Sequence, residues 1–412
     1  RFCSIIEWID WPFSHLDRPR GSRGSIGIIF ASRSPFFALE YRRLESLVDS
    51  FAFELEEVEN EEQDRLAKIR AAMQVQLHYK NVFKLVIVVG FVYLAYLIFF
   101  SSSNDVMPII DVELRDVVSY AVLAVEMGGH AVAAIHKENK LAVQQKGLTD
   151  EGKAELLTKA DLVSNKLILD VLKRFMGLKI VSEEHESESV TDEEAEAYRE
   201  DRYSLWQSIR GSIDVLPSRK VRLDDLQVFV DPLDATQEFT EGLTEYVTVM
   251  VCITQGDDPI FGAIYRPFHN ETIFGVANWG VMTSSGKMIK PPKEGEAPPT
   301  IVVSRSHAGE VKTLAEKAFG SGYSVESAGG SGYKTLRLAN ATAELYIHET
   351  AIKKWDTCAG DAIVRALGGA MLDMDGSPLK YGPSTSVVNK RGLVVSARNP
   401  YTYYQKLRSF LP

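Results

Sequence analysis

Residues 231–236, Asp-Pro-Leu-Asp-Ala-Thr, place two carboxylates three positions apart. They follow an apolar segment of strand character and precede a helix start near Thr236. Pro232 restricts the backbone, so Asp231 and Asp234 are expected to converge where the strand ends. Two neighbouring carboxylates repel each other unless a cation lies between them. Hard oxygen ligands suit Mg²⁺, which keeps several waters and accepts phosphate oxygens, and a helix N-terminus favours an anion. The stretch predicts a magnesium site for phosphate chemistry.

Other carboxylates occupy similar places along the chain. Asp161 lies at a predicted helix start in Thr-Lys-Ala-Asp, and Asp356 follows Trp355 at another. Glu183 and Glu184 follow a short apolar strand. Taken singly, an Asp at a helix start is usually an N-cap and a Glu after a strand usually lies on the surface. Because the same context recurs four times, we interpret these residues as parts of one site.

The order of these motifs resembles the inositol monophosphatase superfamily of lithium-sensitive, magnesium-dependent phosphatases. The resemblance covers about residues 110–411 and rests on TKAD, SEEH in place of the common GEE, DPLDAT and KKWD. Ser182 replaces a glycine of the family pattern and leaves Glu183 intact. The resemblance implies one α/β catalytic domain over 105–412, a layered α-β-α-β-α sandwich of the inositol monophosphatase and fructose-1,6-bisphosphatase type.

The resemblance also implies roles for individual residues. Asp161 and Thr236 look like the pair that orients and deprotonates the attacking water. One Mg²⁺ would lower the pKa of that water and a second would steady the leaving oxygen, with in-line transfer and no covalent enzyme intermediate. A third, weaker Mg²⁺ and inhibition by lithium are further implications. The implied metal ligands are Glu183, Asp231, Asp234, Asp356 and the carbonyl of Leu233.

Two segments resemble the nucleotide-contacting parts of the family branch that hydrolyses 3′-phosphoadenosine 5′-phosphate in the Golgi. They are Ser304-Arg-Ser-His307 and the glycine-rich run from Gly329 to Lys334. His307 is expected to stack on or hydrogen-bond adenine, and Lys334 to hold a second phosphate as a point charge. Gly330 would let the backbone approach the ligand closely. The alternatives are a flexible turn for the glycine run and an ordinary helix-start residue for His307.

The spacing of apolar residues and the turn signals predict the helices and strands that could position these side chains. A loop rich in proline and charge is predicted over 291–299, and an acidic solvated stretch over 183–201. Residues 246–253 and 260–265 are expected to form a hairpin about the turn at 256–259. The predicted helices are 112–136, 160–175, 309–319 and 356–367, and the other predicted strands are 179–181, 226–230, 272–276, 301–304 and 345–347.

An apolar run precedes this domain. Residues 82–100 include only one charged side chain, Lys84, which can extend toward the membrane surface. Nineteen residues span about 28 Å of helix, close to the thickness of a bilayer core. The run predicts a transmembrane anchor. A cleaved signal peptide, with the serines at 101–103 as its cleavage site, and a buried core helix are the alternatives.

Charges beside the run predict its orientation. Basic residues precede it and mostly acidic residues follow it, which places residues 1–81 in the cytosol and 101–412 in the lumen or outside. Residues 1 to about 60 show no clear periodicity, and the tail over 1–81 is expected to be disordered or doubtful sequence, with Met73 as a candidate initiator. The sequons at Asn270 and Asn340 are compatible with lumenal exposure.

Composition excludes several classes of protein. The 412 residues carry a net charge of −10, which argues against a nucleic-acid binder with a basic face. Three cysteines, Cys3, Cys252 and Cys358, cannot build a disulfide framework and contain no CxxC pair for zinc. Cysteine usage alone therefore leaves the redox compartment open.

The apolar run and its flanking charges, taken with what the resemblance implies, predict a single-pass type II Golgi membrane phosphatase with a lumenal catalytic domain. The expected substrate is 3′-phosphoadenosine 5′-phosphate, cleaved to AMP and phosphate in support of sulfation. The alternatives are an inositol phosphate phosphatase and a catalytically inactive membrane scaffold. A homodimer is common in the family, and the sequence itself does not indicate one.

Overall fold

The computed structural model describes residues 79–100, 110–148, 152, 154–185, 190–306 and 310–411. The chain divides into two units, Arg1–Val106 and Met107–Pro412. Within the first unit the described element is helix α2, Tyr79–Phe100. Its 22 residues correspond to about 33 Å of helix, and the large apolar side chains described between Val82 and Leu94 are exposed. The predicted helix over 82–100 is therefore present, and its insertion into a membrane stays a prediction.

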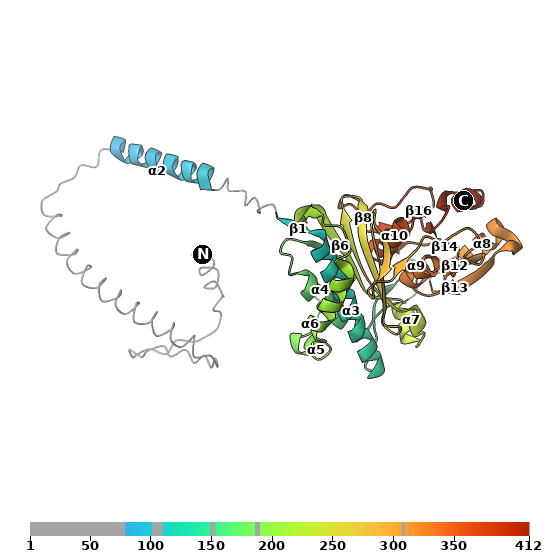
Figure 1. Ribbon diagram of the computed structural model, residues 1–412. Coiled ribbons are helices and arrows are strands. Elements are labelled where there is room, and N and C mark those ends of the chain that lie inside the picture. Colours follow the sequence, from blue (N-terminus) through green and yellow to red (C-terminus); the bar gives the residue numbers. More distant parts are fainter. Residues whose placement is uncertain are drawn as a thin grey trace. The chain divides into compact units, whose positions relative to one another are not determined.

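Three helices cover one face of the larger sheet in the second unit (Figure 1). They are α3 Leu114–Lys137, α4 Lys159–Leu172 and α6 Arg202–Ile213. By length and composition α3 could also cross a membrane. Most of it is instead buried against the sheet, with residues such as Val118, Val122 and Val125 fully inaccessible. Helix α3 is therefore a core helix of the second unit.

The larger sheet has seven strands in the order β11-β10-β9-β8-β7-β6-β4. All neighbours run antiparallel except β4 and β6, which are parallel. Its strands are β4 Lys179–Ser182, β6 Leu226–Asp234, β7 Thr248–Gln255, β8 Asp258–Arg266, β9 Glu271–Val276, β10 Gly280–Thr283 and β11 Met288–Ile289.

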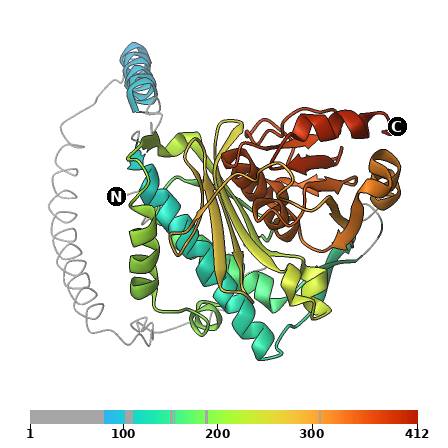
Figure 2. The ribbon, with the colours of Figure 1, turned by 45° about the vertical axis from the view of Figure 1, so that its right-hand side comes forward.

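The opposite face of this sheet packs on two central helices, α9 Ser331–Ala339 and α10 Lys354–Ala366. Beyond them lies a five-stranded sheet in the order β13-β12-β14-β18-β16 (Figure 2). Its strands are β12 Thr300–Ser304, β13 Ser324–Ala328, β14 Leu345–His348, β16 Ala370–Asp373 and β18 Leu393–Ser396.

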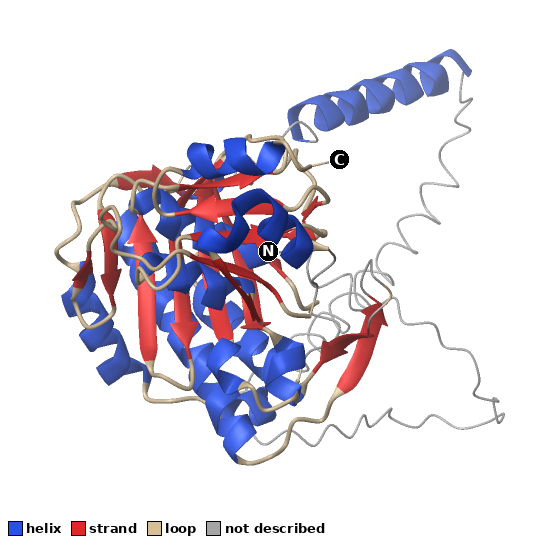
Figure 3. Ribbon diagram, turned by 90° about the vertical axis from the view of Figure 1, so that its right-hand side faces the viewer, coloured by secondary structure: helices blue, strands red, loops and turns tan. Residues whose placement is uncertain are grey.

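Two outer helices, α8 Val311–Phe319 and α11 Pro400–Arg408, close the second sheet. Three hydrophobic clusters fill the spaces between successive layers, and Figure 3 shows the strands of both sheets enclosed by helices. The predicted α-β-α-β-α order is confirmed.

Short elements complete the second unit. Two strand pairs, β1 with β5 and β15 with β17, are antiparallel, as is the hairpin of β2 and β3. The short strands are β1 Asp111–Glu113, β2 Gln144–Leu148, β3 Ala154–Leu157, β5 Lys220–Arg222, β15 Ile352–Lys353 and β17 Val388–Asn389. The short helices are α5 Asp192–Glu196, α7 Thr236–Thr240 and the 3₁₀ turns Leu223–Asp225, Thr244–Tyr246 and Gly320–Gly322.

Candidate active site

The central stretch 231–236 forms a kinked strand end followed by a helix start. Strand β6 pairs with β7 up to Asp231, and the register shifts before Asp234 pairs with Thr248. Ala235 then takes a left-handed conformation with φ of 71°, and α7 begins at Thr236. The side chain of Asp231 accepts a hydrogen bond from the Leu233 N–H at 3.1 Å. The kink turns both carboxylates toward one pocket, as the sequence predicts.

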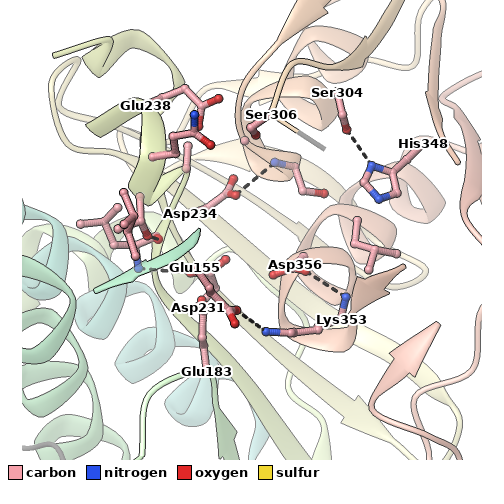
Figure 4. Close-up of a pocket in the computed structure, with 18 of the residues that line it drawn as sticks. Glu155, Glu183, Asp231, Asp234, Glu238, Ser304, Ser306, His348, Lys353 and Asp356 are labelled. Atoms are coloured by element: carbon pink, nitrogen blue, oxygen red, sulfur yellow. Dashed lines mark hydrogen bonds and ion pairs between the residues drawn. The ribbon is translucent and has the colours of Figure 1, made fainter. Parts of the chain in front are cut away.

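Three carboxylates meet in that pocket. Glu183, Asp231 and Asp356 each offer an oxygen, and these oxygens lie within 4.8 Å of one another (Figure 4). Glu183 follows β4, where its N–H donates to the Val230 carbonyl at 3.0 Å. Asp356 lies in the first turn of α10 and accepts the Lys353 N–H at 2.9 Å. Strand β6 and helix α10, far apart in sequence, thus bring their acidic side chains together.

The electrostatics of this cluster favour a bound cation. Burial, followed by repulsion from Glu183, raises the pKa of Asp356 to about 8. The same two causes, in the same order, raise the pKa of Asp231 well above its usual range. Carboxylates that resist ionisation together become acceptable when a divalent cation neutralises them. Three hard oxygen ligands converging from a buried wall fit Mg²⁺.

Asp234 lies in the same pocket but is tied to other groups. Its carboxylate accepts the N–H groups of Ser331 and Gly332, at 3.1 and 2.8 Å, and the Thr248 hydroxyl at 2.9 Å. It therefore caps the N-terminus of α9, where free N–H groups and the helix dipole favour a negative charge. The structure places Asp234 and the buried Leu233 at the pocket wall, and their predicted role as metal ligands stays a prediction.

Asp161 and Thr236 form a direct contact. The Thr236 hydroxyl lies 3.1 Å from Asp161 Oδ1, and also 3.1 Å from the Leu233 carbonyl. The other Asp161 oxygen accepts the backbone N–H of Thr158 at 2.7 Å. Burial is the main cause that raises the pKa of Asp161 to about 6. A carboxyl group with that pKa can accept a proton near neutral pH, so the predicted pair has the geometry for a base.

The predicted substrate side is partly present. Ser304, Gly330 and Lys334 line the same pocket, which has a volume of about 270 Å³. Lys334 is buried, lies 5.1 Å from the centre of the Tyr346 ring and donates to the Gly330 carbonyl. Burial lowers its pKa to about 8, which leaves it largely charged at pH 7. His307 lies outside the described residues.

The glycine run is a helix start as well as a pocket wall. Gly330 has φ of 63° and precedes α9 directly. A Cβ on Gly332 would lie 2.3 Å from Thr248 Oγ1 and 3.2 Å from Asp234 Oδ2. The run is therefore packed against the carboxylate that it caps, and the alternative of a flexible turn is wrong.

Two lysines beside the acidic cluster were given no role by the sequence analysis. Lys146, on β2, donates to Glu183 at 2.8 Å and also contacts Glu184. Lys353 pairs with Glu155 at 2.6 Å beside the acidic cluster (Figure 4). Both ion pairs join residues distant in the chain, so a local pattern could not reveal them.

A buried histidine is a further addition to the pocket. His348 ends β14 and lines the same wall. Its Nδ1 lies 2.7 Å from the Ser304 hydroxyl. The predicted substrate residue Ser304 is thus paired with a neighbouring side chain of the same sheet.

Comparison with known proteins shows the family of the chain. The model of the inositol monophosphatase family matches residues 113–409. Inositol monophosphatase 3 of Xenopus tropicalis is 38% identical over 293 residues, which cover 69% of this chain and 78% of that protein. The Golgi-resident adenosine 3′,5′-bisphosphate 3′-phosphatase of Mus musculus is 38% identical over 296 residues, covering 70% of this chain and 79% of that protein.

Solved structures share the fold at lower identity. The SuhB protein of Bartonella henselae superposes with a TM-score of 0.54 at 16% identity and covers 72% of this chain and all of its own. CysQ of Bacteroides thetaiotaomicron, a bacterial member of the same family, gives 0.51 at 22% identity, covering 69% and 98%. Fold, motif order and sequence identity agree, and this chain is a phosphatase that belongs to the inositol monophosphatase family.

Proposed function

We propose that the protein hydrolyses 3′-phosphoadenosine 5′-phosphate to AMP and phosphate with the help of Mg²⁺. The observation that carries this substrate is the composition of the pocket. An acidic cluster for metal and phosphate chemistry lies beside the ammonium groups of Lys334 and Lys353 in one cavity. A substrate with two phosphates can place one at the cluster and the other near a lysine. The 37–38% identical relatives named for adenosine 3′,5′-bisphosphate support the same choice.

In this proposal Glu183, Asp231 and Asp356 hold the metal, and Asp234 and the Leu233 carbonyl complete the ligand set. Bound there, Mg²⁺ supplies positive charge that lowers the pKa of a water and neutralises phosphate oxygens. The residues of the chain do the rest.

Thr236 orients the water through its hydroxyl, and Asp161 accepts the proton through the contact at 3.1 Å. The water oxygen bonds to phosphorus in line as the bond from phosphorus to the 3′ oxygen breaks. The released 3′ oxygen takes a proton from solvent water and becomes the hydroxyl of AMP, and Asp161 returns its proton to solvent before the next cycle.

Recognition of the nucleotide falls to the wall formed by α9 and the second sheet. Lys334 is held by the Gly330 carbonyl and the Tyr346 ring, so its ammonium group is fixed before substrate arrives. A fixed charge binds an anion without first losing side-chain freedom. Ser304 and its partner His348 offer polar groups for the sugar or base on the same wall.

Two other functions compete with this one. Relatives named inositol monophosphatase 3 are as similar to the chain as those named for the nucleotide, so hydrolysis of an inositol phosphate is the second candidate. An inactive scaffold is less well supported, because Asp161, Thr236 and the three clustered carboxylates are in place.

We also propose a lumenal Golgi location for the catalytic unit, anchored by α2 as a type II protein. The positive charges before α2, the apolar character of that helix and the relatives named as Golgi-resident support it. There the enzyme would clear the nucleotide by-product of sulfation.

The test is phosphate release by the full chain, purified in detergent, with Mg²⁺. We expect a lithium-sensitive preference for 3′-phosphoadenosine 5′-phosphate over inositol 1-phosphate. Lys334→Met should remove most of that preference, and Lys317→Met, a matched change in α8 away from the pocket, should not. Equal or better hydrolysis of inositol 1-phosphate by the parent would overturn the nucleotide assignment while keeping the phosphatase.

A further inference from the structure

A disulfide bond crosses the boundary between the larger sheet and the central helices. It joins Cys252 on β7 to Cys358 on α10, 106 residues apart, with Cα atoms 5.7 Å from each other. Both side chains are buried. The cysteine count predicts no disulfide framework, and the structure adds this one bond. No local sequence pattern predicts this pairing, so we ask which parts of the fold the bond holds together.

The bond lies beside the acidic cluster at both of its ends. Cys358 follows the metal-ligand candidate Asp356 by two residues on α10. Cys252 pairs across the sheet with Phe229, which precedes Asp231 by two residues on β6. The disulfide thus links the helix that carries one carboxylate to the strand next to the one that carries another.

The surrounding packing leaves little space between helix and sheet. Cys252 lies opposite Gly262 on β8, where an added Cβ would come within 2.3 Å of the Ala359 carbonyl oxygen. On β9, a Cβ on Gly275 would lie 2.8 Å from Ile363 Cα. Helix α10 therefore rests directly on the backbone of the sheet. Two unbonded sulfurs need a wider separation than bonded ones, and close-packed interiors accommodate such an expansion poorly.

We propose that the Cys252–Cys358 bond is a positioning element of the metal site, which holds Asp356 in register with Asp231 and Glu183. When a dithiol reductant opens the bond, the first turn of α10 shifts and the site binds Mg²⁺ more weakly. In that exchange the protein disulfide gains two electrons and two protons, and the reductant becomes a disulfide. The inference rests on the proposed metal site and does not depend on which phosphate ester is the substrate.

The Cys252–Cys358 bond is also relevant to the cellular compartment in which the catalytic unit works. Disulfides persist in oxidising compartments and are rare in the cytosol. A site that needs this bond would be complete in the secretory pathway, where the proposed topology places the catalytic unit, and weakened in a reducing one.

The test uses the full chain purified in detergent without reductant. Alkylation and peptide mass mapping should recover the peptides of Cys252 and Cys358 linked. Thermal unfolding is then followed against Mg²⁺ concentration, with and without dithiothreitol, and no substrate is added. We expect the reductant to raise the Mg²⁺ concentration for half-maximal stabilisation by about 10-fold, as is typical when groups that orient metal ligands are lost.

Two variants complete the design. Cys252→Ala/Cys358→Ala should need the same higher Mg²⁺ concentration and should no longer respond to dithiothreitol. Cys3→Ser should respond like the parent. If reduction lowers only the metal-free melting temperature and leaves the Mg²⁺ dependence unchanged, the bond is structural and the proposal is wrong. Free thiols at both positions in the unreduced protein would overturn it as well. This test does not depend on hydrolysis of the nucleotide, since it measures Mg²⁺ binding. A protein that fails to hydrolyse the nucleotide can therefore still show whether the bond positions the metal site or is only structural.

Discussion

The Thr236 hydroxyl lies 3.1 Å from Asp161 Oδ1, although the two residues are 75 positions apart. Asp161 is fixed at the start of α4 by the Thr158 backbone N–H, and Thr236 opens α7. A hydroxyl between a carboxylate and a water can pass a proton from one to the other. Two helix starts that are distant in the sequence thus bring together the hydroxyl and the carboxylate of the proposed proton acceptor.

Replacing Thr236 with Ala should lower kcat by about 10²- to 10⁴-fold, since the water loses its orienting hydroxyl. Thr236→Ser keeps the hydroxyl and should recover much of the rate. Thr240→Ala is the matched control, because Thr240 also lies in α7 and its hydroxyl donates to the Gln237 carbonyl of the same helix. Steady-state phosphate release measures all three, and a Thr236→Ala variant as active as the control would remove Asp161 and Thr236 from the mechanism.

Gly332→Ala should disturb the site through Asp234. The added Cβ would lie 2.3 Å from Thr248 Oγ1, so the Thr248 hydroxyl has to turn away from Asp234. We expect the free energy of unfolding to fall by about 1–3 kcal/mol, as for other overpacked sites, together with a loss of activity. Gly322→Ala meets open space and should change stability by less than about 0.5 kcal/mol. Chemical denaturation compares the two, and equal stability would contradict the capping contact.

Much of the architecture followed from local patterns. The apolar strand before Asp231 and the hairpin of β7 and β8 agree closely with the prediction, because each has strong periodicity or a clear turn. Helix α9 was not predicted, since Gly330 and Gly332 weaken helix propensity. It is stabilised by a carboxylate 97 positions away, as the Ser331 N–H donates to Asp234.

Contacts made only in the folded chain were also missed. Lys353 pairs with Glu155 across 198 positions, and the disulfide spans 106. The acidic stretch expected to be solvated instead begins with Glu183 inside the pocket and the buried Glu184. Within a short window of sequence these carboxylates look like ordinary surface charge, and only the combination of TKAD, SEEH, DPLDAT and KKWD marks Glu183 as a candidate metal ligand.

Stability without metal should depend on pH with a defined sign. The pKa is raised to about 8 for Asp356, about 7 for Glu184 and about 6 for Asp161, with burial the largest cause in each. Between about pH 4 and pH 8 the folded protein keeps protons that the unfolded chain has released. The free energy of unfolding should therefore fall as pH rises through this window.

Differential scanning calorimetry with a chelator tests this prediction on the metal-free protein. In a parallel series with saturating Mg²⁺ and no chelator, most of the decline in stability above pH 7 should disappear. The variant Asp356→Asn should show a shallower decline than the parent. A metal-free protein that becomes more stable between pH 5 and pH 8 would show that the cluster is not mutually repulsive.

Lys146 should stabilise the metal-free protein. Its ammonium group contacts Glu183 at 2.8 Å and is mostly buried, so Lys146→Met leaves two close carboxylates without a cation. Removing one partner of a buried pair costs about 3–5 kcal/mol, and we expect the lower end because water still reaches the site. Lys140→Met, which removes an exposed pair with Glu138, is the control. Urea denaturation with and without Mg²⁺ should show the loss chiefly without metal, and a loss of equal size with Mg²⁺ would contradict this role.

The most direct test of the acidic cluster as the catalytic centre is Mg²⁺-dependent release of phosphate from 3′-phosphoadenosine 5′-phosphate by the full chain and its Asp231→Asn variant. Asp224→Asn, which changes an exposed aspartate in the 3₁₀ turn just before the same strand, serves as the matched control. We predict that Asp231→Asn loses at least about 100-fold in kcat/KM because a ligand is removed, while Asp224→Asn matches the parent. Hydrolysis by a folded Asp231→Asn variant at the parental rate would show that catalysis takes place elsewhere.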